Sequence, residues 1–136
     1  MANLTRTAMS LDGALLGRFD AWMARHGYTN RSEAMRDLIR AALVEQEWTD
    51  PHAEVVAALS VIYDHAAHDL AQALADIQHR RFHTVLCSQH VHLDRHRCLE
   101  VVLLRGRAGR LRSLADRIIA TRGVRAGKLT LMSTKV

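Results

Sequence analysis

The residues best suited to chemistry in this sequence are two histidines and a cysteine that follow closely on one another. His90 and His92 are two positions apart, so on a β-strand both imidazoles project from the same face. A hairpin through residues 94–97 would return the thiol of Cys98 to the same place at the head of the next strand. Nitrogen and sulfur ligands together suit Zn(II), Cu(II) or Ni(II), and a planar arrangement favours nickel or copper. We therefore expect a transition-metal site.

Three protein ligands leave one position of a four-coordinate site unfilled. His79, just past the expected end of a helix, is one candidate for it, and His83 and His96 are the others, because spacing alone does not choose among them. Glu100 could hydrogen-bond a ligand from the neighbouring strand, or it could face solvent at the strand edge. The other cysteine, Cys87, has the opposite strand parity from the histidine pair, and we expect it to be a small core residue.

The second half of the chain supplies the elements that would position these ligands. Apolar residues alternate or recur with helical spacing in the order strand, helix, strand, strand, helix, strand. This βαββαβ order is the ferredoxin-like arrangement, and the domain is expected to span residues 53–136. Its segments are strands at 55–63, 82–93, 99–104 and 128–134, helices at 66–78 and 111–119, and turns at 106–109 and 123–128.

The first half reads as a short strand followed by two helices. Residues 4–11 alternate in the manner of a half-buried strand, and the apolar stripe after Asp12 has the spacing of an amphipathic helix. A second amphipathic helix starts at Asn30. The helical pattern fails just before the only proline, Pro51, so we place the boundary between domains there. The first domain is expected to span residues 1–48, which makes the whole protein α+β.

A lone strand with one apolar face can bury that face only by pairing with the same strand of a second chain. The resulting two-stranded ribbon fits the major groove of DNA, and Arg6, Ala8 and Ser10 would then face the bases. Arginine can bind guanine through two hydrogen bonds, serine can reach several base edges, and alanine can touch a thymine methyl group. The sequence therefore predicts a dimer that reads double-stranded DNA.

The start of the second helix could hold the DNA backbone on each side of the ribbon. Free N–H groups at a helix N-terminus bind phosphate, and Asn30, Arg31 and Ser32 would add polar side chains. The alternative is that Asn30 is only a helix cap and Arg31 a solvated charge. Net charge does not decide between the two, because residues 1–50 carry six arginines against seven acidic residues, although the whole chain has a formal charge of +5.

The composition is that of a soluble globular protein, with 49% apolar and 24% charged residues. No apolar run approaches the roughly 20 residues that cross a bilayer, and residues 1–11 lack the apolar stretch of a secretory signal. Two cysteines are too few for a disulfide framework. We therefore expect a cytoplasmic protein with no membrane partner.

Two segments resemble one known family of bacterial regulators. Residues 6–11 together with 27–37 look like a ribbon-helix-helix module, and Tyr-x-Asn-Arg-Ser-Glu at 28–33 is similar to that of the nickel-responsive regulators called NikR. The spacing H-x-H-x5-C at 90–98, with a histidine eleven residues before the first, matches the NikR nickel site. The likeness covers nearly the whole chain in the same order.

The resemblance implies a repressor of nickel-uptake genes that binds operator DNA and is not an enzyme. It implies a homotetramer, a dimer of dimers, in which ACT-like domains meet at a planar nickel site. The region of Tyr63 and His65 contributes polar or accessory metal contacts in the family. The implied ligands of one Ni(2+) per subunit are His90, His92, Cys98 and a His79 donated by a neighbouring subunit.

The same resemblance bears on the first domain. It implies base contacts by Arg6 and Ser10, whereas Ala8 stands where the family usually has a hydroxyl residue, so the operator sequence is left open. It also implies a weaker cation site at Glu33 and Asp37. The alternative for these two carboxylates is ion pairing with arginines of the same helix.

Two other functions fit parts of the sequence. A ribbon-helix-helix regulator could sense a small molecule, or another transition metal such as copper, cobalt or zinc, through a ferredoxin-like domain. A zinc hydrolase could use the same three ligands with a bound water. Asp94 and Glu100 are its only close acids, and neither is a convincing general base. The hydrolase also leaves the first domain without a role.

Overall fold

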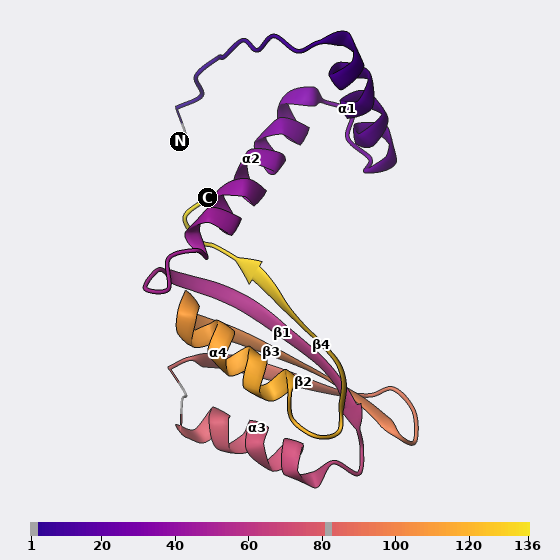
Figure 1. Cartoon of the computed structure of the whole chain (residues 1–136), viewed down its shortest axis with the longest axis vertical. Coiled ribbons are helices and arrows are strands. Elements are labelled where there is room, and N and C mark those ends of the chain that lie inside the picture. Colours follow the sequence, from indigo (N-terminus) through magenta and orange to yellow (C-terminus); the bar gives the residue numbers. More distant parts are fainter. Residues whose placement is uncertain (1–2, 81–82) are drawn as a thin grey trace. The chain divides into compact units, whose positions relative to one another are not determined.

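The computed structural model describes residues 3–80 and 83–136, and Figure 1 shows its helices and strands. The chain divides into two compact units, Met1–Arg40 and Ala41–Val136, and each is described by itself. The strand start expected at Phe82 lies outside the described residues. A helix with the length and apolar character needed to cross a membrane is absent from the part of the chain that the structure describes.

Two helices follow one another in the first part of the chain. α1 (Gly13–Arg25) begins where the Asp12 carboxylate accepts a backbone N–H of the first turn at 2.9 Å. α2 (Arg31–Glu47) begins in the same way, since the Asn30 side chain accepts a backbone N–H at 2.8 Å. Both are the side-chain caps that the sequence indicates. Gly27 lies between the helices at φ 77°, a left-handed conformation that favours glycine and allows a sharp turn.

Residues 3–12 precede α1 and form neither helix nor strand in the single chain. The strand expected at 4–11 would make its hydrogen bonds to a second chain, because a lone strand has no ladder to join. Apolar side chains of this segment are open to solvent, with Leu4 80% and Met9 63% exposed. The pairing of this strand therefore stays a prediction.

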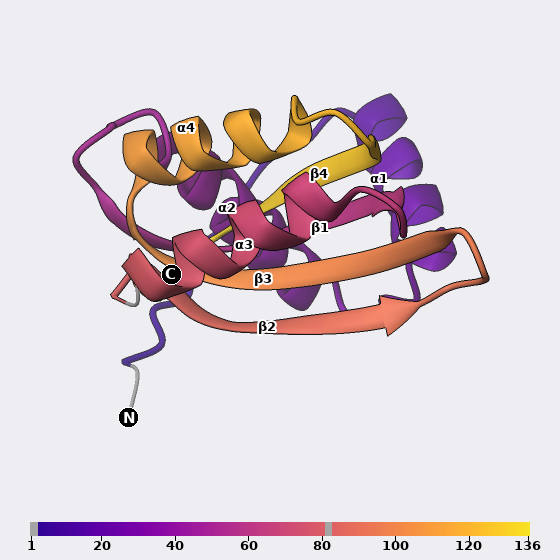
Figure 2. The same ribbon diagram turned by 90° about the horizontal axis from the view of Figure 1, so that it is seen from below.

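The second unit is a four-stranded antiparallel sheet with two helices on one face. The strand order is β2-β3-β1-β4, and Figure 2 shows α3 and α4 on the same side of the sheet. This order and the βαββαβ connection confirm the ferredoxin-like arrangement and the α+β class. The elements are β1 (Glu54–Asp64), α3 (His68–Arg80), β2 (Val85–His92), β3 (Arg97–Arg107), α4 (Ala108–Ile119) and β4 (Val124–Met132).

β4 begins earlier than the sequence predicts. The turn expected over 123–128 is wrong, because only Gly123, at φ 96°, has a turn conformation and the strand starts at Val124. Gly127 lies inside β4, where a Cβ would come within 2.5 Å of the Ile119 side chain of α4. This glycine therefore marks a close approach of helix and strand rather than a turn.

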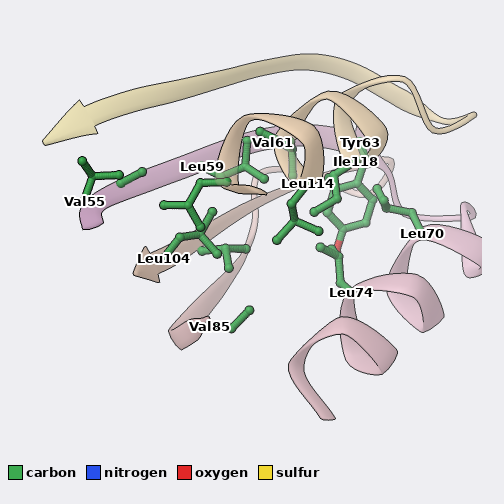
Figure 3. Packing of buried hydrophobic residues seen from close by; sticks show 14 of the residues in the cluster. Val55, Leu59, Val61, Tyr63, Leu70, Leu74, Val85, Leu104, Leu114 and Ile118 are labelled. Atoms are coloured by element: carbon green, nitrogen blue, oxygen red, sulfur yellow. The ribbon is translucent and has the colours of Figure 1, made fainter. Parts of the chain in front are cut away.

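The core of the second unit lies between the sheet and its two helices, and Figure 3 shows part of it. Alternate residues of β1 are buried, the pattern of a strand with one covered face. Leu59, Leu111 and Leu114 are among the largest fully buried side chains. Trp48, the residue after α2, is buried in the same cluster.

The division into units does not coincide with the expected change of domain. The units meet at Arg40 and Ala41, inside α2, whereas the sequence places the change at residues 49–52. The reason is that the last part of α2 packs with the core of the second unit through Val44 and Trp48. The domain limits 1–48 and 53–136 stay a prediction.

The expectation that Cys87 is a core residue is wrong, because its side chain is exposed. β2 is an edge strand whose pairing with β3 shifts between Val85 and Cys87. Cys87 lies opposite Leu103, which is itself 41% exposed. Cys87 and the histidine pair do lie on opposite faces of β2, but the helices cover the face that carries the histidines.

Candidate metal centre

The hairpin of β2 and β3 brings the predicted ligands together on the helix-covered face of the sheet. Its register pairs His92 with Cys98 and His90 with Glu100, and paired residues point to the same side. The Sγ atom of Cys98 lies 3.5 Å from Nδ1 of His92. The rings of His90 and His92 have centroids 4.8 Å apart. The local sequence thus places three potential ligands side by side.

Asp94 holds the turn of this hairpin. Its Oδ1 atom accepts the backbone N–H groups of His96 and Arg97, each at 2.8 Å, and its Oδ2 atom lies 2.6 Å from Nη2 of Arg97. The hydrogen bond from the His96 N–H and the contacts with Arg97 lower the pKa of Asp94 to about 2. The carboxylate is therefore charged at neutral pH and keeps the return of the chain toward Cys98 in place.

A further imidazole belongs to this cluster. His65 follows β1, and its Nδ1 lies 3.3 Å from the Sγ of Cys98. Ligand atoms of His65, His92 and Cys98 all lie within 4.8 Å of one another. Sequence spacing alone does not identify His65 as a ligand, because its position beside Cys98 depends on the pairing of Tyr63 with Cys98 across β1 and β3.

His90 is held by two oxygen atoms at one of its ring nitrogens. Its Nδ1 lies 2.8 Å from Oε2 of Glu100 and 3.0 Å from the hydroxyl of Tyr63. The Tyr63 hydroxyl also donates to the same carboxylate oxygen at 3.4 Å. Glu100 is 7% exposed, so it faces inward rather than toward solvent. A carboxylate in this position orients a histidine so that the other nitrogen, Nε2, is available to a metal.

Burial and negative charge act together on the protons of this centre. Burial raises the pKa of the Cys98 thiol, and the carboxylates of Glu100 and Asp94 raise it further. Burial also raises the pKa of Tyr63 to about 12, with a contribution from the charge of Glu100. Both groups therefore keep their protons at neutral pH. A metal ion has to displace the thiol proton, because the thiolate is the form that binds.

The donor set fits a borderline transition metal. Imidazole nitrogens and a cysteine sulfur suit nickel, copper, cobalt or zinc, whereas magnesium and calcium prefer oxygen ligands. The three nearest donors come from two strands and a loop of one chain. Such a set needs no rearrangement of the sheet to present nitrogen and sulfur to one ion.

The candidates for the fourth ligand lie elsewhere. His79 is in the last turn of α3 and is exposed. Neither His79 nor its rivals His83 and His96 belongs to the cluster of three ligand atoms, within the residues that the structure describes. The donation of His79 from another subunit stays a prediction.

The residues expected to contact DNA all lie in the first unit. Arg6, Ala8 and Ser10 are exposed in the segment before α1. Asn30 caps α2, which is one of the two roles expected for it, and Ser32 is exposed in the first turn of the helix. These positions are compatible with contact to a large partner, and the base and phosphate contacts stay predictions.

Two carboxylates of the first unit hold arginines. Arg31 donates through Nε and Nη2 to the two carboxylate oxygens of Asp20 at 2.8 and 2.7 Å, and this hydrogen bonding lowers the pKa of Asp20. Asp37 accepts the Tyr28 hydroxyl at 2.9 Å and pairs with Arg40 at 3.2 Å. Both oxygens of Asp37 thus have protein partners, which favours ion pairing over a cation site there.

The two helices of the first unit, the ferredoxin-like second unit and its nitrogen and sulfur cluster are consistent with one class of protein, a ribbon-helix-helix regulator with a metal-binding ACT-like domain. Residues 56–132 match the NikR C terminal nickel binding domain. The chain belongs to the NikR family.

Relatives match this chain over nearly its full length. One protein from Solibacter usitatus is 46% identical and one from Nitratidesulfovibrio vulgaris is 48% identical, each over 134 residues that cover 98% of this chain and 96% of the relative. A protein from Trichlorobacter lovleyi is 44% identical over 133 residues, with the same coverage. All three are named as candidate nickel-responsive regulators.

Proposed function

We propose that this protein is a nickel-dependent transcriptional repressor that binds operator DNA in the cytoplasm and controls nickel-uptake genes. Membership of the NikR family supports nickel binding and regulation rather than catalysis. The observation that carries the proposal is the buried thiol of Cys98 with imidazole nitrogens of His65 and His92 at 3.3 and 3.5 Å. Nitrogen and sulfur donors of this kind favour a borderline transition metal over the hard cations of the cell.

The proposed ligands of one Ni(2+) per subunit are His90, His92, Cys98 and a His79 from a neighbouring subunit. The ion would link two subunits and bind the thiolate that it deprotonates. His65 lies beside the same sulfur in the single chain, so the competing ligand set is His65, His92 and Cys98. Nickel affinities of His79→Ala and His65→Ala distinguish the two sets, because only the variant that lacks a true ligand should lose affinity.

The proposed assembly is a homotetramer, a dimer of dimers, on double-stranded DNA. An open groove of the first unit supports pairing with a second copy, because it is lined by apolar side chains that the chain does not bury by itself. These are Met9, Leu11, Leu16, Phe19, Met35 and Ile39. The residues proposed to contact DNA in the dimer are Arg6, Ala8, Ser10, Asn30, Arg31 and Ser32.

A mobility-shift titration of operator-containing DNA with and without Ni(II) tests the repressor function. We expect nickel to strengthen binding by the natural protein, and His90→Ala and Cys98→Ala to lose that effect. Cys87→Ser is the matched control, since this cysteine is exposed and lies outside the cluster. DNA binding that is the same with and without nickel in all four proteins would contradict the proposal.

The identity of the metal needs its own measurement. Copper(II) binds most sites of nitrogen and sulfur donors more tightly than nickel(II), so competition for binding alone does not identify the metal. The protein is therefore loaded separately with nickel, copper, cobalt or zinc ions, and the DNA affinity of each form is measured in the mobility-shift assay. We expect nickel to give the largest gain in DNA affinity and to add visible absorption bands that filled-shell Zn(II) lacks. A larger gain with copper, cobalt or zinc would replace nickel in the proposal and leave a regulator of another metal.

A further inference from the structure

The end of α2 is built into the second unit instead of being joined to it by a free linker. α2 is one unbroken helix over Arg31–Glu47, and the compact units divide within it, between Arg40 and Ala41. Trp48, the next residue, is 2% exposed and belongs to the hydrophobic core of the second unit. Val44, one turn earlier, packs against the same core.

Three polar contacts hold this end of the helix. The indole N–H of Trp48 donates to the carbonyl of Met132 at 3.0 Å. The guanidinium carbon of Arg112 lies 5.2 Å from the centroid of the Trp48 ring, within the range of a cation–π interaction. The ammonium group of Lys135 is 2.8 Å from Oε1 of Glu47, an oxygen shielded from solvent. We call these five residues the Trp48 clamp.

The segment after Trp48 is fixed as well. The carbonyl of Pro51 accepts the N–H of Gly109 at 3.0 Å, and the carbonyl of Ala53 accepts the N–H of Ala108 at 2.9 Å. Pro51 packs so closely on α4 that a Cβ on Gly109 would lie 2.9 Å from the proline Cβ. The chain between α2 and β1 is therefore fixed to the start of α4 and cannot easily change its path if the second unit moves.

β1 connects the Trp48 clamp to the metal centre. Near the start of the strand, Val56 pairs with Met132 of the clamp. Near its end, Tyr63 pairs with Cys98. The hydroxyl of Tyr63 also lies 3.0 Å from Nδ1 of His90. Since β1 is hydrogen-bonded to β3 on one side and β4 on the other, its two ends belong to one well-supported element.

We propose that Trp48 is a positioning residue that couples the state of the metal centre to α2, and through α2 to the DNA-binding unit. The inference rests on the proposed nickel-dependent DNA binding and says how the two events are linked. Coupling of two sites requires an element that both sites bias, and α2 is the covalent path between the units. Without the Trp48 clamp, nickel and DNA each still bind, but nickel no longer strengthens DNA binding.

The test uses the full-length protein and three measurements: nickel affinity without DNA, DNA affinity without nickel, and DNA affinity with nickel. We expect Trp48→Ala to reduce the nickel-induced gain in DNA affinity by about fivefold or more. Its nickel affinity without DNA should equal that of the natural protein, because the polar contacts of Trp48 are with Met132 and Arg112 and not with a metal ligand. Trp48→Phe keeps an aromatic ring and loses the N–H, so it should retain part of the gain.

Arg112→Ala is the second variant for the same three measurements, in case Trp48→Ala is too unstable to assay. Its matched control is Arg110→Ala, an exposed arginine of the same helix that is not part of the Trp48 clamp. We expect the gain to fall in Arg112→Ala and to be unchanged in Arg110→Ala.

Two results would overturn the inference. A lower melting temperature with an unchanged nickel-induced gain in the Trp48 and Arg112 variants would show that the clamp only stabilises the fold. Absence of any gain in the natural protein would overturn the proposed function itself, and with it the coupling. The two failures are distinguishable because only the second appears without a mutation.

Discussion

The two units differ in how they bury apolar side chains. Among the residues that the structure describes, the buried apolar side chains of the first unit are Met23 and Ala34, and all the others lie in the second. The first unit instead leaves Leu4, Met9 and Ile39 between 55% and 80% exposed. A unit of this size cannot easily build a core alone. The second unit carries its own core, whereas the first leaves most of its large apolar side chains at least partly open to solvent.

Each unit is expected to need a partner for a different purpose. In the first unit the partner strand would cover an apolar groove, which is a matter of folding. In the second unit the partner would add a histidine to a cluster whose fold is already formed, which is a matter of metal binding. Mutations can therefore separate stability, assembly and sensing.

The largest effect should come from the core of the second unit. Leu111 is fully buried against the sheet, so Leu111→Ala should lower the free energy of unfolding by about 2–5 kcal/mol. Chemical denaturation followed by circular dichroism measures the loss. Leu103→Ala, at a position that is 41% exposed, is the control and should cost much less. Equal losses would mean that the open face of the sheet is as well covered as the core.

The next effect concerns the groove of the first unit. Ile39 is 55% exposed in the single chain, and its side chain lines the groove. If a second copy covers it, Ile39→Ala should weaken the dimer by about 1.5–3 kcal/mol. Analytical ultracentrifugation gives the dissociation constant. Thr29→Ala, exposed and outside the groove, is the control, and a dimer of unchanged affinity would argue against this pairing surface.

A smaller effect is expected from the carboxylate that orients His90. Glu100→Gln should lower nickel affinity by about 10- to 100-fold, because the imidazole loses its charged hydrogen-bond acceptor. Isothermal titration calorimetry at constant pH measures it, with Glu54→Gln at the exposed start of β1 as control. Unaltered affinity would show that Glu100 serves the core of the second unit and not its metal centre.

The smallest effect is a dependence of stability on pH at the Trp48 clamp. The Lys135 ammonium and then the Ser133 hydroxyl lower the pKa of Glu47 below its usual value of 4.5. A depressed pKa stabilises the folded state above the unfolded pKa, and this contribution is lost as the pH falls through the folded pKa. Melting temperatures from pH 6 down to pH 3 should therefore fall less steeply in Glu47→Gln than in the natural protein. Glu45→Gln is the control, and identical slopes in Glu47→Gln and the natural protein would contradict the ion pair.

Much of the second unit is predictable because its signals are local. The alternation of 55–63 gives β1, and the close spacing of His90, His92 and Cys98 gives the hairpin that joins them. The same is true of the caps Asp12 and Asn30, which act within one helical turn. These features depend on residues a few positions apart, so their physical cause is visible in the sequence.

Features that depend on distant segments are not predictable in the same way. His65 reaches Cys98 only through the register of β1 against β3, which no local pattern fixes. Cys87 shows the related error, because parity distinguishes two faces but not which of them the helices cover. Gly127 resembles a turn residue until the packing of Ile119 on β4 is known. In each case a partner remote in sequence decides the outcome.

The burial of Cys98 has a consequence for the speed of the response. The sulfur is completely buried, whereas His65 and His92 are exposed above it. An ion that arrives from solvent meets the imidazoles first and the sulfur last, and a competing chelator meets them in the same order. The bond to the buried sulfur is then the last one that a chelator can reach. We expect the time the protein needs to reset after nickel is withdrawn to follow the rate at which a chelator reaches Cys98 more closely than the equilibrium affinity for nickel.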